Sequence, residues 1–505
     1  MTAPLTVADD LSRAKYELEL FLLAGEFDLY EDHRFLGPVD PKHTSADVSY
    51  GKLILSCWGD EWSRSWRVVA IEMKSGRLLL QCTKQMGRTN CLLELRRGDT
   101  EDDAAPTRAE FAAKLSALIE SNLTSLRVVR AIVARHDQRH LSGVHVRLIL
   151  RDHEKTVAGI GTSEREMQSA TDAALSAGII WLHELRRGGS MIERLIIFVP
   201  QGRSTTIATR LTAVNLAGAM VTLFEVDEAS ESIEPVAAYD QGDLTDRQRR
   251  AARRALWPRE QPLEAPIARQ VDQIVGLAPD LIEARKIGGW VNLSIRGFEF
   301  ARVSNRTGNA QFGSGEWRRR LDGETRRELE HWVADIVAYR DAAAPRRDES
   351  IYRAQAERWL EWMIRRDVTA IDPTLDTRYV YAQVPTYRGE QRTFIDLLTA
   401  TRGGRLAVIE LKVSEDPEFP FQGLDYWLRV EWHRQRGDFK RRGYFAGLEI
   451  ADAPPLLYLV APLFRFHATT KLIAESISDR VPVYRVGINE NWRAGVRVLL
   501  SERLN

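Results

Sequence analysis

The sequence predicts a multi-domain α/β protein, and three observations lead to this prediction. The chain has 505 residues, which is more than one hydrophobic core ordinarily organises. Its composition, with 44% hydrophobic and 28% charged residues, is typical of a globular protein. Short β-prone runs alternate with longer amphipathic segments, which is the pattern of helices that pack on sheets.

Changes in composition along the chain predict where the domains begin and end. A polar stretch at residues 99–106 is typical of a linker, and a charged stretch with a proline at residues 342–350 marks a second boundary. A basic run at residues 247–254 is interpreted as a solvated helix face. We therefore expect an N-terminal α+β domain, an α/β domain, a connecting α/β segment and a C-terminal α/β domain, at residues 1–98, 107–235, 236–345 and 346–505.

No segment of the sequence predicts a membrane span. The longest apolar runs, such as residues 456–461, fall far short of the roughly 20 residues that a spanning helix needs. An apolar run at residues 20–24 is interrupted by acidic residues and follows no basic segment, so we expect no signal peptide.

The three cysteines predict neither a disulfide framework nor a zinc site. Cys57, Cys82 and Cys91 form no C-x-x-C pair and are odd in number. Free thiols of this kind are typical of a reducing compartment, so we expect a cytoplasmic protein. The formal net charge is +0, and any affinity for nucleic acid must therefore come from locally concentrated positive charge.

Near the C-terminus, two β-prone runs joined by a glycine turn carry an unusual charge pattern. In the second run, the alternation of a strand places Leu406, Val408, Glu410 and Lys412 on one face, and the other face is wholly apolar. Burying a carboxylate and an ammonium at the end of a core strand is costly unless they are paired or bind a metal. Asp396 lies on the preceding strand and can come alongside Glu410, so a functional site is expected here.

These residue types are the ones that phosphodiester hydrolysis requires. Asp396 and Glu410 offer hard oxygen ligands to Mg²⁺ or Mn²⁺, with coordination positions left for water and a phosphate oxygen. Such an ion stabilises charge in the transition state and lowers the pKa of bound water. Lys412 can orient the attacking water and stabilise negative charge. The alternative is an ordinary ion pair between Glu410 and Lys412 at the end of a strand.

The order of these residues resembles the PD-(D/E)XK nuclease superfamily. Asp396 is followed, fourteen positions later, by Glu410-x-Lys412 and then by an expected helix. The amino-acid sequence of both strands is most similar to the mismatch-specific endonuclease branch, although Ile395 stands where the superfamily has proline. RecB-like members show Gln-x-x-x-Tyr on the next helix, and Gln422 and Tyr426 match that pattern.

The resemblance covers about residues 350–490 and implies a restriction-endonuclease-like αβββαβ core with a mixed sheet. The expected order of elements agrees: helix 354–366, strand 379–384, the two motif strands, helix 421–436 and strand 456–461. Many members carry a further metal-binding glutamate on the first helix. Glu357 is the first choice here and Glu361 the second, because both lie on the same side of that helix.

The resemblance implies a divalent-metal-dependent deoxyribonuclease, an endonuclease in repair or defence. The catalytic set would be Asp396, Glu410, Lys412, Gln422 and Glu357, of which Asp396, Glu410 and Glu357 would hold Mg²⁺ or Mn²⁺. Cations interleaved with aromatic residues favour nucleic-acid contacts from Tyr426, Arg429, Arg434, Arg436, Lys440 and Arg441. RNA is an alternative substrate, and a homodimer an open alternative to a monomer. A nuclease-fold protein that binds nucleic acid, or acts as a scaffold, without cutting is the rival function.

Three further patterns complete the sequence-based expectations. Glu72-x-Lys74 runs directly into a hairpin turn, so we interpret it as a pair of solvated charges. Glu415, Asp416 and Glu418 are expected in a solvated loop. Residues 195–200 resemble residues 457–462, and a strand follows each proline at the same 21-residue offset. We therefore hypothesise a degenerate nuclease-like copy in residues 107–235, with Gly159 and Gly161 opposite Glu410 and Lys412.

Overall fold

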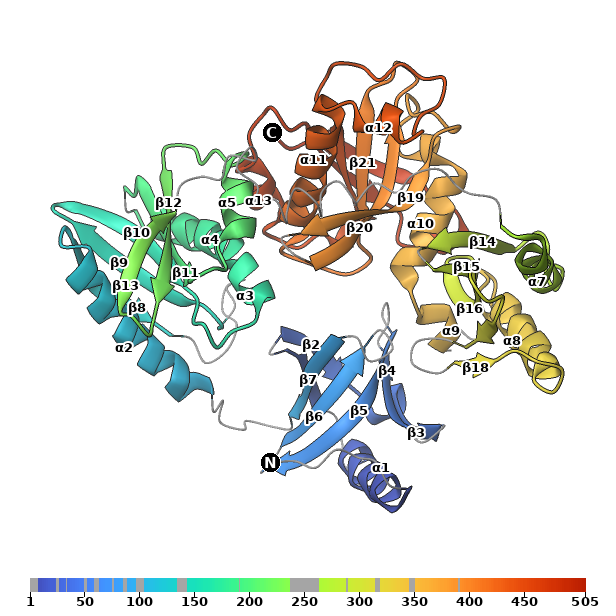
Figure 1. Ribbon diagram of the computed structural model, residues 1–505. Helices are drawn as coiled ribbons and strands as arrows, with labels where there is room; N and C mark the ends of the chain where they lie inside the picture. Colours follow the sequence, from blue (N-terminus) through green and yellow to red (C-terminus); the bar gives the residue numbers. More distant parts are fainter. Residues whose placement is uncertain are drawn as a thin grey trace. The chain divides into compact units, whose positions relative to one another are not determined.

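The computed structural model describes residues 8–23, 27–32, 34–49, 52–58, 63–74, 77–84, 89–96, 104–133, 143–189, 191–236, 263–287, 289–313, 318–344, 350–388 and 391–505. These residues form four β-sheets with helices packed against them, so the protein is a multi-domain α/β protein (Figure 1). Each sheet is built from one stretch of the chain. The basic run at residues 247–254 lies outside the described residues.

The chain divides into two compact units. The first unit comprises residues 1–101, 260–363 and 493–495, and the second unit comprises residues 102–259, 364–492 and 496–505. Both units are therefore assembled from segments that are distant in the sequence. Among the helices of the described residues, none is long and apolar enough to cross a membrane.

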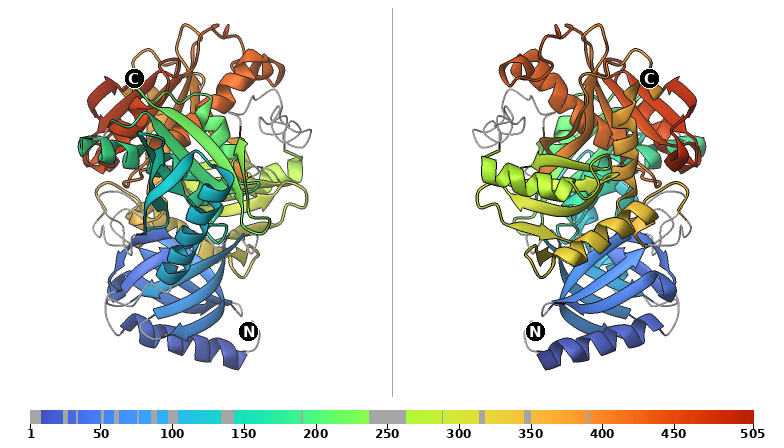
Figure 2. Two further views of the ribbon diagram at one scale, coloured as in Figure 1. Left: turned by 90° about the vertical axis from the view of Figure 1, so that its left-hand side faces the viewer. Right: turned by 90° about the vertical axis from the view of Figure 1, so that its right-hand side faces the viewer.

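The first unit contains two antiparallel sheets. In the seven-stranded sheet the strand order is β2-β1-β7-β6-β5-β4-β3, and α1 lies across one face (Figure 2). Its elements are α1 (Ala8–Leu23), β1 (Phe27–Glu31), β2 (Arg34–Val39), β3 (Thr44–Ser49), β4 (Lys52–Trp58), β5 (Ser63–Lys74), β6 (Arg77–Lys84) and β7 (Thr89–Arg96). Cys57, Cys82 and Cys91 are buried free thiols in this sheet, and burial raises the pKa of Cys57.

The second sheet of the first unit has five strands in sequence order, with two helices on one face. The apolar sides of α7 and α8 share a core with alternate residues of these strands. The elements are α7 (Ala265–Val275), β14 (Ile282–Ile287), β15 (Trp290–Ile295), β16 (Phe298–Ser304), β17 (Ala310–Phe312), β18 (Arg319–Arg320) and α8 (Arg326–Tyr339). This unit also includes α9 (Ser350–Arg353) and most of α10 (Ala356–Arg366).

The second unit contains two six-stranded mixed sheets, which divide it into an N-terminal half (residues 104–236) and a C-terminal half (residues 364–492 and 496–505). The N-terminal half consists of α2 (Ala104–Asn122), β8 (Leu126–Ile132), β9 (Val146–Asp152), β10 (Lys155–Gly161), α3 (Gln168–Asp172), α4 (Ala174–Arg187), β11 (Arg194–Pro200), α5 (Thr205–Leu211), β12 (Met220–Asp227) and β13 (Ser232–Val236). Figure 1 shows α2 along one face of this sheet and α4 on the other.

The C-terminal half carries the two motif strands. Its elements are β19 (Tyr381–Arg388), β20 (Gln391–Ala400), β21 (Leu406–Leu411), α11 (Phe419–Gln435), α12 (Asp438–Arg441), β22 (Leu456–Pro462), α13 (Thr470–Glu475), β23 (Val483–Ile488) and β24 (Val498–Arg503). The sheet order is β19-β20-β21-β22-β23-β24, in which β21, β22 and β23 are parallel and the outer pairs are antiparallel. Gly404 takes φ +82° in the turn between β20 and β21.

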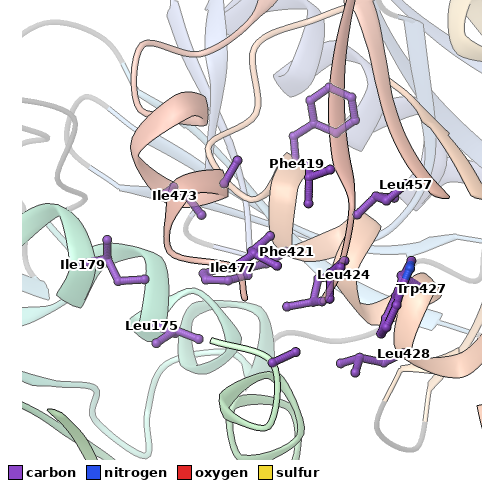
Figure 3. Close-up of a cluster of buried hydrophobic side chains, with 14 of the residues drawn as sticks. Leu175, Ile179, Phe419, Phe421, Leu424, Trp427, Leu428, Leu457, Ile473 and Ile477 are labelled. Atoms are coloured by element: carbon purple, nitrogen blue, oxygen red, sulfur yellow. The ribbon is translucent and has the colours of Figure 1, made fainter. Parts of the chain in front are cut away.

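The helices of the two halves meet in one shared hydrophobic core. Leu175 and Ile179 of α4 lie in the same buried cluster as Phe421 and Leu424 of α11 and Ile473 of α13 (Figure 3). Helix α4 contacts α13, and α11 contacts α5. The two halves therefore form one folded unit, because neither helix layer is covered without the other.

A buried arginine ties the halves together inside this core. Arg210 lies on α5 and is 0% exposed. Its Nε and Nη2 donate to the two carboxylate oxygens of Asp425, both at 2.9 Å, and its Nη1 lies 3.1 Å from Oε2 of Glu418. Burial alone lowers the pKa of Arg210, but the charges of Asp425 and Glu418 outweigh it and raise that pKa above its ordinary value.

Candidate nuclease site

Asp396 and Glu410 face each other across two adjacent strands. The β20–β21 ladder pairs Leu397 with Ile409, and continuing that register by one residue sets Asp396 opposite Glu410. Beyond this pair of residues, the N–H of Leu411 donates to Oδ2 of Asp396 at 3.0 Å and not to a backbone carbonyl of β20. The side chain of Asp396 is thereby held at the end of β21.

Glu410 and Lys412 lie at the carboxyl end of β21 in a largely buried position. Glu410 is 3% exposed, and Nζ of Lys412 lies 3.9 Å from Oε1 of Glu410. The backbone N–H of Lys412 donates to the carbonyl of Val460, so the parallel ladder with β22 continues to this residue. A buried carboxylate at this separation from an ammonium is partly compensated, and its desolvation makes it a strong site for a cation.

Gln383 is a further residue at this site that the sequence analysis did not identify. It lies on β19 between two residues that pair regularly with β20, and its φ is +53°. Its Nε2 donates to Oδ1 of Asp396 at 3.2 Å, and the residue is buried. A left-handed φ is unfavourable for a non-glycine residue, so the surrounding structure holds the backbone of Gln383 in a strained conformation. Gln383 therefore fixes the second oxygen of Asp396.

Tyr426 lies on α11, where the charges of Glu410 and Asp396 act on it. Burial raises the pKa of Tyr426 well above its ordinary value, and the negative charges of Glu410 and Asp396 raise that pKa further. The phenol therefore stays protonated at neutral pH, although its hydrogen bond to Thr393 acts in the opposite direction and lowers its pKa. Tyr426, which the sequence predicts to contact nucleic acid, lies one helical turn from Gln422 and on the same face of α11.

Gln422 and the preceding loop are ordered by contacts of their own. Nε2 of Gln422 donates to Oδ2 of Asp416 at 3.3 Å, and the N–H of Glu418 donates to Oδ1 of Asp416 at 2.9 Å. The expectation of a solvated loop was wrong for two of its three acids. Asp416 is 6% exposed because it terminates the loop against α11, and Glu418 accepts hydrogen bonds from Arg210 and Ser176. Glu415 is exposed, as expected.

The two candidate glutamates of the first helix belong to the first compact unit. Glu361 is buried, and its carboxylate lies 3.0 Å from Nη1 of Arg358 and 3.5 Å from Nη1 of Arg285. Glu357 is half-buried on α10. The helix begins at Ala356 and not at residue 354, because Gln355 takes φ +50° and separates it from α9.

The predicted nucleic-acid contacts fall into two groups. Arg429 is half-buried, and Arg434 forms ion pairs with Glu431 and Asp452, each with a contact of 2.7 Å. The three others form an exposed group at the end of α11 and in α12: Arg436, Lys440 and Arg441. Of these, Arg436 stacks over the ring of Trp432 at 4.6 Å, and Arg441 pairs with Asp438. The exposed group is the one that presents charge to solvent.

Two neighbouring residues of α11 are structural. Trp427 is buried and its Nε1 donates to the carbonyl of Pro455 at 2.7 Å. His433 is 1% exposed, and its Nδ1 lies 2.8 Å from Oδ2 of Asp438. Burial lowers the pKa of His433 to about 4, so the imidazole is neutral at physiological pH and must carry its proton on Nδ1 to donate to Asp438.

The donor set at this site suits a hard divalent cation. Asp396 and Glu410 offer carboxylate oxygens on adjacent strands, and oxygen ligands are those that Mg²⁺ and Mn²⁺ prefer. Among the described residues, no group of three or more His, Cys, Asp or Glu side chains could hold a metal ion. Two carboxylates with the rest of the shell left to water and phosphate is the usual arrangement of Mg²⁺ in phosphoryl-transfer sites. The Glu72-x-Lys74 pattern differs, because Glu72 is exposed.

Comparisons with known proteins give one distant similarity. No family model matches the chain, and no curated protein matches it. One solved structure, described as that of an EndoMS–dsDNA complex, is 14% identical, with a TM-score of 0.15, and the match covers 41% of this chain and 92% of that chain. Similarity at this level does not assign the chain to a family.

Proposed function

We propose that the C-terminal half is a divalent-metal-dependent nuclease that hydrolyses phosphodiester bonds in DNA. The observation that carries this proposal is the meeting of Asp396, from the middle of β20, with Glu410 and Lys412 at the carboxyl end of β21. Two acids and an amine placed side by side at the end of an inner strand have no evident structural purpose, because an apolar strand end would cost less free energy.

The order of elements supports the same proposal. A helix, three strands, a helix and a strand follow one another as α10, β19, β20, β21, α11 and β22. A mixed sheet of this kind, with the acids on its second antiparallel pair, β20 and β21, and with α11 packed on β21, is the arrangement expected for a restriction-endonuclease-like core. Glu357 stays a prediction from the sequence resemblance, and we include Gln422 as a supporting residue in this proposal.

The residues of the chain would divide the reaction between them. A bound Mg²⁺ or Mn²⁺ would stabilise charge on the scissile phosphate and lower the pKa of the attacking water. Asp396 and Glu410 would hold that ion, with Asp396 kept in place by Gln383 and by the N–H of Leu411. Lys412 would orient the water and stabilise negative charge.

The substrate and setting follow from the chemistry as further proposals. We propose DNA cut internally in a cytoplasmic repair or defence process, and RNA is the alternative substrate because the same chemistry cleaves it. A homodimer would supply two cutting centres. Arg436, Lys440 and Arg441 are exposed at the end of α11 and in α12, so they are the strongest candidates for contacts with the phosphate backbone. Tyr426, Arg429 and Arg434 remain candidates that would need local rearrangement.

The test is cleavage of plasmid and single-stranded DNA by the full chain, with Mg²⁺, with Mn²⁺ and with chelator. Asp396→Asn and Glu410→Gln should each lower the cleavage rate by about 1000-fold or more, since a bound ion contributes several kcal/mol to the transition state. Glu415→Gln is the matched control, because it removes an exposed acid from the loop that follows β21. It should cut normally.

Calorimetric titration with Mn²⁺ separates the proposal from its rival. A nuclease should bind the ion, and both carboxylate variants should bind it more weakly while they unfold at the same temperature as the wild type. DNA binding without cleavage in any metal, together with no Mn²⁺ heat, would favour a protein that binds nucleic acid without cutting. Full activity in Lys412→Ala and Asp396→Asn would refute the assignment of the site.

A further inference from the structure

The two halves of the second unit have the same strand topology. Their sheets run β8-β9-β10-β11-β12-β13 and β19-β20-β21-β22-β23-β24. In each, two antiparallel pairings are followed by two parallel pairings and a final antiparallel one. A helix follows the third strand and another follows the fourth strand in both halves. Different strand orders would have ended the hypothesis of a duplicated fold, and the orders are identical.

The hydrogen-bonded ladders align the two halves residue by residue. Pro200 and Pro462 end the fourth strands, and on that alignment Ala158, which pairs with Leu195, corresponds to Val408, which pairs with Leu457. The N–H of Thr162 donates to Phe198 as that of Lys412 donates to Val460. Ile160 and Thr162 therefore stand at the positions of Glu410 and Lys412. The sequence alignment with Gly159 and Gly161 was wrong by one residue, because it was anchored in the loop after the strand.

The same ladders put an arginine at the position of Asp396. Ile160 pairs with Arg147 on β9, just as Glu410 lies opposite Asp396. Gly178 of α4 lies against Leu195, and Gly423 of α11 lies against Leu457, so these two glycines correspond. Three residues beyond each glycine, Trp181 stands where the C-terminal half has Tyr426. The N-terminal half has thus exchanged an acidic site for an arginine and a tryptophan.

Arg147 belongs to a face of the sheet that carries four arginines. Arg127 pairs with Arg151, Arg130 pairs with Ile149, and Arg147 and Arg151 alternate with Ile149 on β9, so all four arginines share one face. This face lies opposite α2, which packs on Val146, Leu148 and Leu150. Arg127, Arg130 and Arg151 are exposed, whereas Arg147 is 7% exposed and lies 5.6 Å from the centroid of the Trp181 ring.

We propose that this arginine face, defined as Arg127, Arg130, Arg147 and Arg151, binds the phosphodiester backbone of a nucleic acid. On β8, β9 and β10 the face carries no aspartate or glutamate. Arginine offers phosphate oxygens two parallel N–H donors, which makes it the preferred residue for phosphate. It is also the face on which the C-terminal half carries its candidate cutting site, so both halves would hold the same class of ligand. The DNA assignment rests in this respect on the proposed function.

The residues at this position in the N-terminal half are suited to binding a phosphate but not to cleaving it. Ile160 and Thr162 provide no carboxylate for a divalent cation, and Arg147 places a fixed positive charge where the other half has a negative one. A cation is repelled from such a position, whereas an anionic phosphate is attracted to it. Trp181 donates its Nε1–H to the carbonyl of Leu148 at 3.0 Å, and the ring provides a rigid support for the guanidinium of Arg147.

The test measures binding of a fluorescent DNA duplex by the full chain in a Glu410→Gln background, with chelator, so that cleavage does not interfere. The variant Arg127→Gln/Arg130→Gln/Arg151→Gln removes the three exposed charges of the face. The matched control, Lys155→Gln/Arg165→Gln/Arg187→Gln, removes three exposed charges elsewhere in the same half. Thermal unfolding of both variants verifies that each is folded.

The salt dependence of binding gives the expected magnitude. Each phosphate contact contributes a slope of roughly 0.9 in the plot of log affinity against log salt. Losing three contacts should therefore reduce the slope by about 2.7, and the affinity ratio between background and variant should fall about 40-fold between 50 and 200 mM salt. The control should keep the slope of the background.

Two outcomes would overturn the inference. One is an equal slope in the arginine variant and its control. The other is displacement of the duplex by polyglutamate at lower concentrations than by unlabelled DNA, lost in the arginine variant, which would assign the face to an acidic protein. Failure of the proposed cutting activity is separate, because it leaves the salt slope unchanged. A chain that never cuts but loses slope in the arginine variant supports the inference alone.

Discussion

Replacing Arg210 by methionine should destabilise the second unit more than any exposed arginine substitution. Arg210 is fully buried and forms ion pairs with both Asp425 and Glu418. Methionine occupies a similar volume but leaves these carboxylates without their cation, and breaking one partner of a buried ion pair costs about 3–5 kcal/mol. The loss comes from the charges left behind and not from a cavity.

The size of the second unit determines how far this loss of free energy lowers its melting temperature. The second unit spans about 300 residues, and unfolding entropy of about 2.1 cal/mol/K per residue gives roughly 0.6 kcal/mol per degree. The expected decrease is therefore about 5–8 °C in the transition of this unit, measured by differential scanning calorimetry of the full chain. Because the two halves share one core, the unit should melt in a single transition.

Two companion variants make this prediction refutable. Arg187→Met removes an exposed arginine that pairs with Glu184 at 3.1 Å, and a pair of this kind contributes about 0–1 kcal/mol. The double variant Arg210→Met/Asp425→Asn removes one of the stranded charges and should recover part of the lost stability. If Arg210→Met melts no lower than Arg187→Met, the buried pair does not hold the two halves together.

Three further predictions concern the C-terminal half. Burial lowers the pKa of His433 to about 4, below the value of about 6.5 in the unfolded state. As the pH falls, the unfolded state therefore takes up a proton first, and about 3 kcal/mol of stability should be lost between pH 6.5 and 4. In urea unfolding, His433→Gln should flatten this dependence of stability on pH. Gln383→Gly relieves the φ of +53° but removes the hydrogen-bond donor to Asp396. Cleavage should therefore slow about tenfold without loss of stability. An unchanged cleavage rate would exclude a positioning role for Gln383. Gly404→Ala forces a Cβ to within 1.9 Å of the Glu449 carbonyl at φ +82° and should lower stability by at least about 1 kcal/mol, whereas Gly403→Ala, which meets only Thr401 at 3.9 Å, should not.

Local sequence patterns predicted much of the C-terminal half. The alternation in residues 406–413 set the buried strand, and the glycines at 403 and 404 set the turn that brings Asp396 back towards Glu410. Both depend only on short-range backbone preferences, which are visible in the sequence. The helix from Phe419 to Gln435 and the strand from Leu456 to Pro462 begin and end within two residues of the expected bounds.

Long-range contacts were the part that the sequence did not predict. Gln383 looks like any strand residue, and nothing local announces a positive φ there. The partial burial of Glu418 depends on Arg210, which lies more than 200 positions earlier in the chain. Strand β8 also carries no clear local signal, because it is an edge strand with exposed arginines and lacks the apolar alternation of an inner strand.

The pairing of α4 with α13 and of α11 with α5 resembles the self-complementary contact of a two-fold dimer, built here within one polypeptide. In a true dimer of identical subunits every substitution is made twice, so one active centre cannot be lost while the other is kept. A single chain that holds two such halves is free of that constraint. A chain with one cutting centre would sever one strand per encounter, so a supercoiled plasmid should accumulate first as a nicked circle, and linear product should wait for a second chain.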